Sequence, residues 1–171
     1  VPVDDNARGK EETAMKAIKL QEPRQVDCVE LEKPVPGPGQ ALVRIKTAGI
    51  CGSDIGAFRG TNKLVSYPRI IGHELAGILE EVPADNPKGL KPGDKVIVDH
   101  YLYCGKCYTC SIGRTNCCTD LKVLGVHIDG GMAEYLCHPA DMLVKMTEDM
   151  DWTDAAMDET MTTTLHGIHR G

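Results

Sequence analysis

The chain has 171 residues and a mass of 18.6 kDa, with 42% hydrophobic, 26% charged and only 4% aromatic residues, as expected for one globular domain with a mainly aliphatic core. The formal net charge of −6 and a sequence pI of about 5.5 argue against a dedicated nucleic-acid-binding protein. No apolar run reaches the roughly 20 residues of a membrane span and no secretory signal pattern opens the chain, so we expect a cytoplasmic protein without a membrane partner.

The opening segment, VPVDDNARGKEETA, is polar and has neither helical nor strand periodicity. Met15 then begins MKAIKL, which is typical of a native start. We therefore interpret residues 1–14 as a tag or linker and leave them out of the fold prediction.

Most of the remaining chain has the pattern of short β-strands separated by Gly and Pro turns. We predict strands within residues 16–20, 25–32, 40–50, 73–82, 95–99, 130–139 and 141–146. Only the tail, from about Thr153 to His169, has a helical pattern. This order indicates a mainly β fold with short helices, an α+β barrel or sandwich of Greek-key type, spanning residues 15–152 and followed by a helix over 153–171.

The segment 40–50 alternates in polarity. We expect one of its faces to carry Ala41, Val43 and Ile45, and the opposite face to carry Leu42, Arg44 and Lys46. Cys28 and Cys137 lie in other predicted strands, where a cysteine is usually a small buried hydrophobic residue.

Four of the eight cysteines form a C-x2-C-x2-C-x7-C pattern: Cys104, Cys107, Cys110 and Cys118. Four thiolates in one short polar loop suit a closed tetrahedral zinc site, which stabilises a lobe at about residues 99–120 and performs no chemistry. A disulfide framework is the alternative, but a chain without secretory features has little use for one. Cys117 stands beside Cys118 and is a second candidate for the fourth ligand.

Two further motifs, GICGSD at 49–54 and GHE at 72–74, are weak when taken singly. Ser53 and Asp54 are good helix N-caps, and His73 can be an ordinary surface histidine. Together with the four-cysteine loop, and in this order, the motifs resemble the zinc-containing medium-chain alcohol and polyol dehydrogenases. The segments GRTNCC and GVHIDGGMAEYL are most similar to the L-galactonate (hexonate) 5-dehydrogenase branch.

The resemblance implies a GroES-like, partly open barrel and two zinc sites. It implies that Cys51 and His73 bind a catalytic zinc with a carboxylate, either Glu74 or Glu159. It also implies that Ser53 relays the alcohol proton, and that Asp54 orients the metal-bound histidine.

The chain departs from the family in two places. The family's Ile-Glu-Pro-Leu motif reads Asp158-Glu159-Thr160-Met161 here, so that Thr160 stands at the proline position. No G-x-G-x-x-G follows a predicted strand, so we expect the nucleotide-binding Rossmann domain to be absent from this chain. We expect NAD or NADP to bind only the full-length enzyme, a homodimer or homotetramer, and this segment alone to be inactive.

The leading hypothesis from the sequence is the catalytic half of an NAD(P)-dependent dehydrogenase that oxidises a secondary alcohol of a polyol or sugar acid. The alternatives are a non-catalytic zinc-stabilised module and a cochaperonin-like subunit, neither of which requires Cys51 and His73 together. The other histidines match no ligand position, and we expect them to be surface or packing residues: His100, His127, His138, His166 and His169.

Overall fold

A computed structural model describes residues 13–171, and the proposed tag or linker lies almost wholly outside the described residues. The first strand, β1 (Ala14–Glu22), begins one residue before Met15 and pairs with β2 (Gln25–Glu32) in a hairpin. Arg24 takes a left-handed conformation in the turn, with φ of 69°. β4 (Arg69–Ile70) pairs with the other edge of β1, which completes a three-stranded antiparallel sheet.

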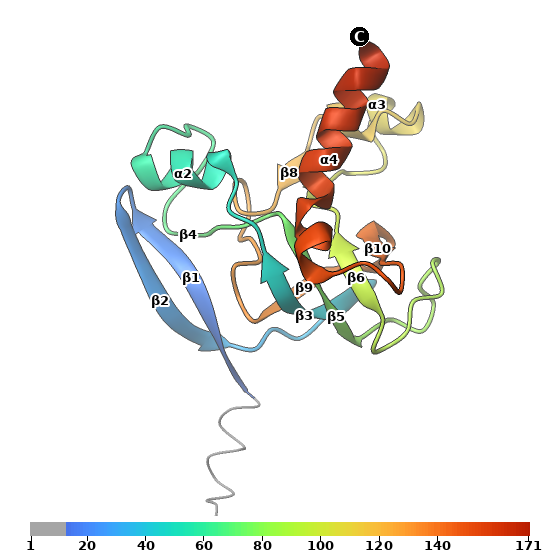
Figure 1. The fold of residues 1–171 in the computed structure, drawn as a ribbon, viewed down its shortest axis with the longest axis horizontal. Coiled ribbons are helices and arrows are strands. Elements are labelled where there is room, and N and C mark those ends of the chain that lie inside the picture. The colour runs from blue at the N-terminus through green and yellow to red at the C-terminus, as the bar shows by residue number, and fades with distance from the viewer. Residues whose placement is uncertain (1–12) are drawn as a thin grey trace, which may run out of the picture.

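A larger sheet of five strands forms the body of the molecule, in the order β10-β6-β5-β3-β9 (Figure 1). Every pairing within it is antiparallel. Its strands are β3 (Gln40–Ala48), β5 (Leu75–Glu81), β6 (Lys95–Val98), β9 (Tyr135–Pro139) and β10 (Leu143–Lys145). All pairings between the named strands of residues 13–171 are antiparallel, so this part of the chain holds no parallel βαβ unit of a nucleotide-binding fold.

The main core lies against this sheet and is aliphatic, as the composition predicts. Ala41, Val43, Leu75, Val96 and Leu143 are at most 1% exposed. Burial of apolar surface is the dominant favourable contribution to folding, so these closely packed side chains stabilise the domain. The mainly β architecture is confirmed, and it fixes the strand ends from which the site residues extend.

A small lobe extends from the end of β6. A two-stranded ribbon, β7 (Tyr101–Leu102) with β8 (Lys122–Val123), forms its base. Between them the chain forms the short helix α3 (Tyr108–Ser111) and a 3-10 turn (Thr115–Cys117).

Two longer helices carry residues of interest. α2 (Gly52–Arg59) follows β3, and α4 (Trp152–Arg170) ends the chain. Asp151 caps α4 by accepting the backbone N–H groups of Thr153 and Asp154. The first turns of α4 pack on the five-stranded sheet, and its C-terminal end projects from the body (Figure 1). Four apolar side chains of α4 are 47–68% exposed: Met157, Met161, Leu165 and Ile168.

Burial departs from the simple strand pattern in two places. Leu42, which the alternation puts on the opposite face from Ala41 and Val43, is buried together with them. The expectation that the strand cysteines are buried was wrong. Cys28 is exposed and Cys137 only half-buried, because β2 is an edge strand and β9 ends the larger sheet.

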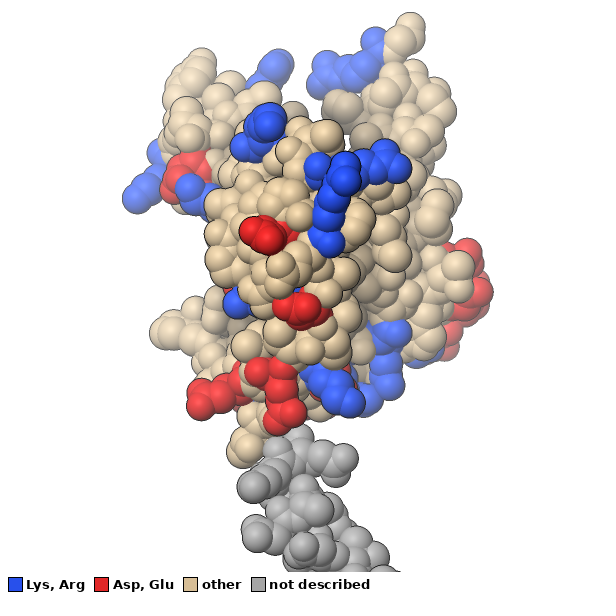
Figure 2. All heavy atoms as spheres, turned by 90° about the vertical axis from the view of Figure 1, so that its left-hand side faces the viewer, with Lys and Arg blue, Asp and Glu red and all other residues tan. Residues whose placement is uncertain are grey.

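Figure 2 shows the face that carries the β1–β2 hairpin and α2. Basic and acidic side chains both occur on it, and neither sign forms a continuous stripe. Within residues 13–171, none of the helices is long and apolar enough to cross a membrane.

Candidate metal centres

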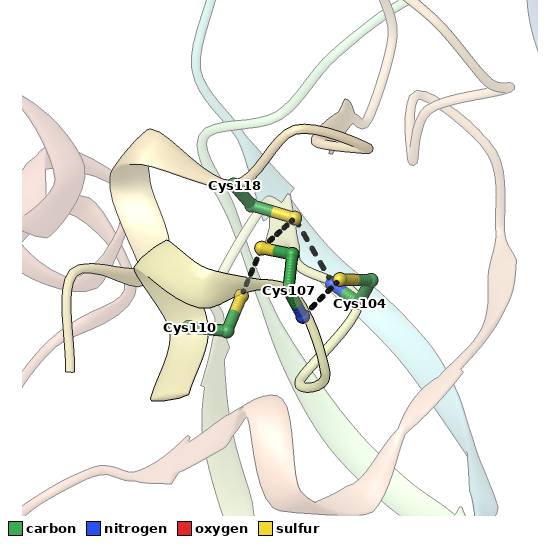
Figure 3. Close-up of side chains that lie close together, drawn as sticks. All are labelled: Cys104, Cys107, Cys110 and Cys118. Atoms are coloured by element: carbon green, nitrogen blue, oxygen red, sulfur yellow. Dashed lines mark hydrogen bonds between the residues drawn. The ribbon is translucent and has the colours of Figure 1, made fainter. Parts of the chain in front are cut away.

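The lobe brings the four cysteines of the spaced pattern together. The sulfurs of Cys104, Cys107, Cys110 and Cys118 lie within 4.8 Å of one another and point to a common centre (Figure 3). The sulfur of Cys107 is 3.4 Å from that of Cys110 and 3.9 Å from that of Cys118. A tetrahedron with Zn–S bonds of about 2.3 Å has edges of about 3.8 Å, so this donor set fits zinc.

Backbone N–H groups point at these sulfurs. Those of Cys104 and Asp120 donate to Cys118 Sγ over 3.3 and 3.4 Å, and that of Cys107 donates to Cys104 Sγ over 3.4 Å. The hydrogen bond with the Thr109 hydroxyl, and to a smaller extent those with backbone N–H groups, lower the pKa of Cys107 to about 5. Desolvation and the neighbouring Cys107 sulfur raise the pKa of Cys110 to about 12. Thiolates this close repel one another, and a divalent cation at their centre removes that repulsion.

The structure distinguishes the two adjacent cysteines. Cys118 is 8% exposed and its sulfur belongs to the group, whereas Cys117 is exposed at the end of the 3-10 turn. Of the two adjacent cysteines, Cys118 is therefore the one whose sulfur could complete the group of four.

A second group joins residues from two separate segments. Ligand atoms of Cys51, His73 and Glu74 lie within 4.8 Å of one another. Cys51 is the N-cap of α2, and His73 and Glu74 directly precede β5. One sulfur, one nitrogen and one oxygen donor match the three protein ligands of a zinc site that keeps a fourth position open.

Asp54 connects the two segments of this group. It is 4% exposed, and its Oδ2 accepts the backbone N–H of Cys51 over 2.9 Å, which completes a capping box at the start of α2. Its Oδ1 accepts the N–H of Gly72 over 3.3 Å and lies 3.8 Å from Nδ1 of His73. Asp54 is thus both a capping residue and the carboxylate that faces the histidine ring.

The His73 ring lies between Asp54 and Ser53. Its Nδ1 is buried without a hydrogen-bond partner, and its Nε2 is 3.5 Å from the Ser53 hydroxyl. A buried imidazole is rarely left so poorly satisfied. A cation bound at Nε2 would polarise the ring and strengthen the attraction of Nδ1–H to Asp54.

Glycines allow the close approach of backbone segments here. A side chain at Gly49 would overlap the Glu74 carboxylate, since an added Cβ would lie 2.1 Å from its Oε2. Gly72 has φ of 95°, and an added Cβ at Gly130 would lie 2.3 Å from the Gly72 carbonyl oxygen. The loop around Gly130 therefore packs directly on the backbone that presents His73.

The two candidate carboxylates lie in different surroundings. Glu74 is 8% exposed and belongs to the group, and its Oε1 accepts the Thr160 hydroxyl of α4 over 3.3 Å. Glu159 is outside the group. Its Oε1 accepts the Thr163 hydroxyl over 3.2 Å and lies 3.8 Å from Nε2 of His100.

His100, which we expected from the sequence to be a surface or packing residue, lies beside the group. It is 5% exposed, and its ring centroid lies 5.3 Å from that of His73 and 4.0 Å from that of Tyr101. Burial lowers its pKa, although Glu159 acts in the opposite direction. Its place directly after a predicted strand, at the end of KVIVDH, was the one signal available.

A cavity of about 380 Å³ opens between α4 and the strand ends, and His100, Tyr101 and Glu159 line it. Leu75, Ile97 and Ala155 form part of its apolar wall. The site therefore combines a three-donor group with an adjoining pocket of the size and mixed polarity that suits a small molecule.

Comparison with known proteins identifies the family to which this fold and these donor groups belong. Residues 37–148 match the family model of the alcohol dehydrogenase GroES-like domain. That match covers more than half of the chain, and the chain belongs to this family.

Several of its relatives are named as dehydrogenases. An uncharacterized zinc-type alcohol dehydrogenase-like protein of Haemophilus influenzae is 49% identical over 91% of this chain and 46% of its own length. The L-galactonate-5-dehydrogenase of Escherichia coli K12 is 38% identical over 92% of this chain and 46% of its own length. The structure of RspB from E. coli CFT073, an alcohol dehydrogenase in complex with NADH, superposes with a TM-score of 0.78 at 43% identity, covering 85% of this chain and 42% of that one. The chain thus spans about half the length of the relatives it matches.

Proposed function

We propose that this chain is the zinc-binding catalytic half of an NAD(P)-dependent dehydrogenase that oxidises a secondary alcohol of a polyol or sugar acid. The observation that carries the proposal is the convergence of Cys51, His73 and Glu74 beside a cavity of about 380 Å³. The substrate class is supported by the 38% identity to the L-galactonate-5-dehydrogenase. The cofactor is supported by the NADH complex of RspB.

The three donors would hold a zinc ion, and the cavity lies beside them, lined by Leu75 next to Glu74 and by His100 next to the His73 ring. Zinc bound there supplies a Lewis acid that lowers the pKa of a nearby substrate hydroxyl, and a nicotinamide cofactor supplies the hydride acceptor. Residues of this chain would bind and orient the substrate and move the proton. Ser53, whose partly exposed hydroxyl lies 3.5 Å from His73 Nε2, would relay the proton of the alcohol, accepting it while its own hydroxyl proton passes to water.

Other residues of the site hold these groups in place. Asp54 fixes Cys51 through a 2.9 Å hydrogen bond and faces Nδ1 of His73, which leaves Nε2 as the ring nitrogen that would bind the metal. Glu159 and His100 form a polar edge on the cavity, where hydroxyl groups of a polyol would find an acceptor and a donor.

A non-catalytic module stabilised by zinc would need only the four-cysteine lobe. A second donor group, packed against glycine backbone and near a cavity, would not be required in such a module. The presence of Ser53 and Asp54 beside Cys51 and His73 favours the enzyme.

The test is turnover and metal content of the complete protein that carries this chain. With NAD⁺ or NADP⁺, it should oxidise polyols or hexonates faster than simple primary alcohols, and Cys51→Ser should remove one zinc and abolish turnover. Cys28→Ser, which changes an exposed cysteine on β2, is the matched control and should change neither. A Cys51→Ser variant with unchanged zinc content and turnover would contradict the proposal.

A further inference from the structure

Glu159 and Thr160, which are neighbours on α4, contact different residues of the site. Glu159 turns toward His100, and its Oε1 also accepts the Thr163 hydroxyl of its own helix. Thr160 turns toward Glu74 and donates its hydroxyl to Oε1 of that carboxylate over 3.3 Å. α4 therefore carries one candidate carboxylate, Glu159, and contacts the other, Glu74.

The carboxylate of Glu74 is confined on two sides. Its Oε2 lies where an added Cβ on Gly49 would be only 2.1 Å away, so Gly49 leaves just enough room for it. On the other side Oε1 accepts the Thr160 hydroxyl. A buried carboxylate with one oxygen hydrogen-bonded has few rotamers left, and an aligned ligand loses less conformational freedom when it binds a metal.

From these contacts, we infer that Thr160 is a positioning residue that holds Glu74 as the carboxylate of the Cys51–His73–Glu74 group. Glu159 stays outside that group, beside His100 and Thr163. This inference rests on the proposed function, since it assigns the carboxylate of the proposed zinc site. It also gives a physical role to the residue at which the chain departs from the Glu-Pro-Leu pattern, because a proline side chain has no hydroxyl to donate.

The matched variants are Thr160→Val, Thr160→Ser and Thr164→Val. Valine keeps the shape of threonine but removes the hydroxyl, and serine retains a hydroxyl. Thr164 lies one turn further along α4, and its hydroxyl binds the Thr160 carbonyl of the same helix. Thr164→Val is therefore the same chemical change without the contact to Glu74.

The measurement is Co²⁺ affinity of the complete protein at the Cys51–His73–Glu74 group, by competition with a chelator, together with the ligand-field absorption of the bound Co²⁺. Thr160→Val should weaken binding by about tenfold, the low end for a partner of a metal ligand, because Thr160 is exposed. It should also shift the absorption bands. Thr160→Ser should restore most of the affinity, and Thr164→Val should match the unaltered protein. In a Glu74→Gln background, Thr160→Val should cause little further loss.

The outcomes separate this inference from the proposed function. If Glu74→Gln loses the metal but Thr160→Val binds Co²⁺ like the unaltered protein, the role of Thr160 is wrong and the zinc site stands. If Glu159→Gln loses the metal and Glu74→Gln does not, the assignment of the carboxylate is overturned. If Cys51→Ser and both glutamate variants retain Co²⁺ in this group, the proposed function itself fails.

Discussion

Nε2 of the fully buried His138 on β9 lies 2.9 Å from the carbonyl oxygen of Asp99, the residue before His100. Burial lowers the pKa of His138 to about 4, so the neutral ring donates its Nε2–H to this carbonyl. The contact ties the larger sheet to the corner that carries His100 against His73.

The lowered pKa of His138 predicts acid-sensitive stability. Between about pH 6.5 and 4 the unfolded state binds more protons at this histidine, so the free energy of unfolding falls as the pH falls. The contribution is fully present above about pH 6.5, and its loss by pH 4 is on the order of 3 kcal/mol. Denaturant titrations across this range should show a shallower pH slope for His138→Gln, whose amide can still donate to Asp99.

The matched control is His166→Gln, which changes an exposed histidine of α4. All these proteins share the same metal centres, so a difference in slope isolates His138. Identical slopes for His138→Gln and the unaltered protein would contradict the prediction.

Cys117 and Cys118, which are adjacent in the lobe, allow a test of the four-cysteine centre. Cys118→Ser should remove one zinc and lower Tm by about 5–10 °C, since losing a structural metal costs several kcal/mol and each kcal/mol moves Tm by about 2–4 °C at this size. Cys117→Ser changes an exposed thiol one position away and should leave both zinc content and Tm unchanged. Metal analysis and thermal unfolding measure the two effects, and equal behaviour of the two variants would refute the assignment.

Cobalt provides a spectroscopic test of Cys51. Co²⁺ placed in the Cys51–His73–Glu74 group, with zinc kept in the lobe, should show a thiolate-to-metal charge-transfer band in the near ultraviolet. The band should disappear in Cys51→Ser and persist in Cys28→Ser. If the band survives in Cys51→Ser, its source is another thiolate, and Cys51 is not a ligand.

The backbone contact at Gly130 predicts an effect on stability. Gly130→Ala would place a methyl group 2.3 Å from the Gly72 carbonyl oxygen, so it should lower the free energy of unfolding by about 1–3 kcal/mol. It should also weaken metal binding at His73, because the segment that presents this ring must shift. Gly167→Ala on α4, with open space around it, should instead stabilise by about 0.5–1 kcal/mol. Denaturant unfolding of both variants is the check, and a neutral Gly130→Ala would show that the two backbones can separate at no cost.

The sequence predicted those features that depend on local pattern. Turn residues and alternating polarity located the strands, and the spacing of Cys104 to Cys118 located a cluster that the structure brings together. It could not indicate that Leu42 is buried together with Ala41 and Val43, or that Cys28 is exposed on an edge strand, because burial depends on how the strands pack in the folded chain.

The sequence did not indicate the roles of His100 and Thr160 in the candidate site for the same reason, since both depend on tertiary contacts. Thr160 contacts Glu74, and Glu159 contacts His100, because α4 packs back over the end of β6 and the residues before β5. No periodicity within one segment encodes such a contact. The residue types of Cys51, His73 and Glu74 suggested a site, whereas the environment that separates Glu74 from Glu159 arises from tertiary packing.

The exposed apolar side chains of α4 also provide a chemical reporter. Met157 and Met161 are 47% and 57% exposed, whereas Met15, Met142 and Met146 are at most 8% exposed. Among the methionines, mild peroxide oxidises the accessible thioethers to sulfoxides before the buried ones. The buried methionines of the same chain therefore serve as an internal reference. Oxidation rates at Met157 and Met161, measured by mass spectrometry, would therefore show whether this face of α4 is exposed to solvent or covered by another part of the protein. The measurement needs no label and no activity assay.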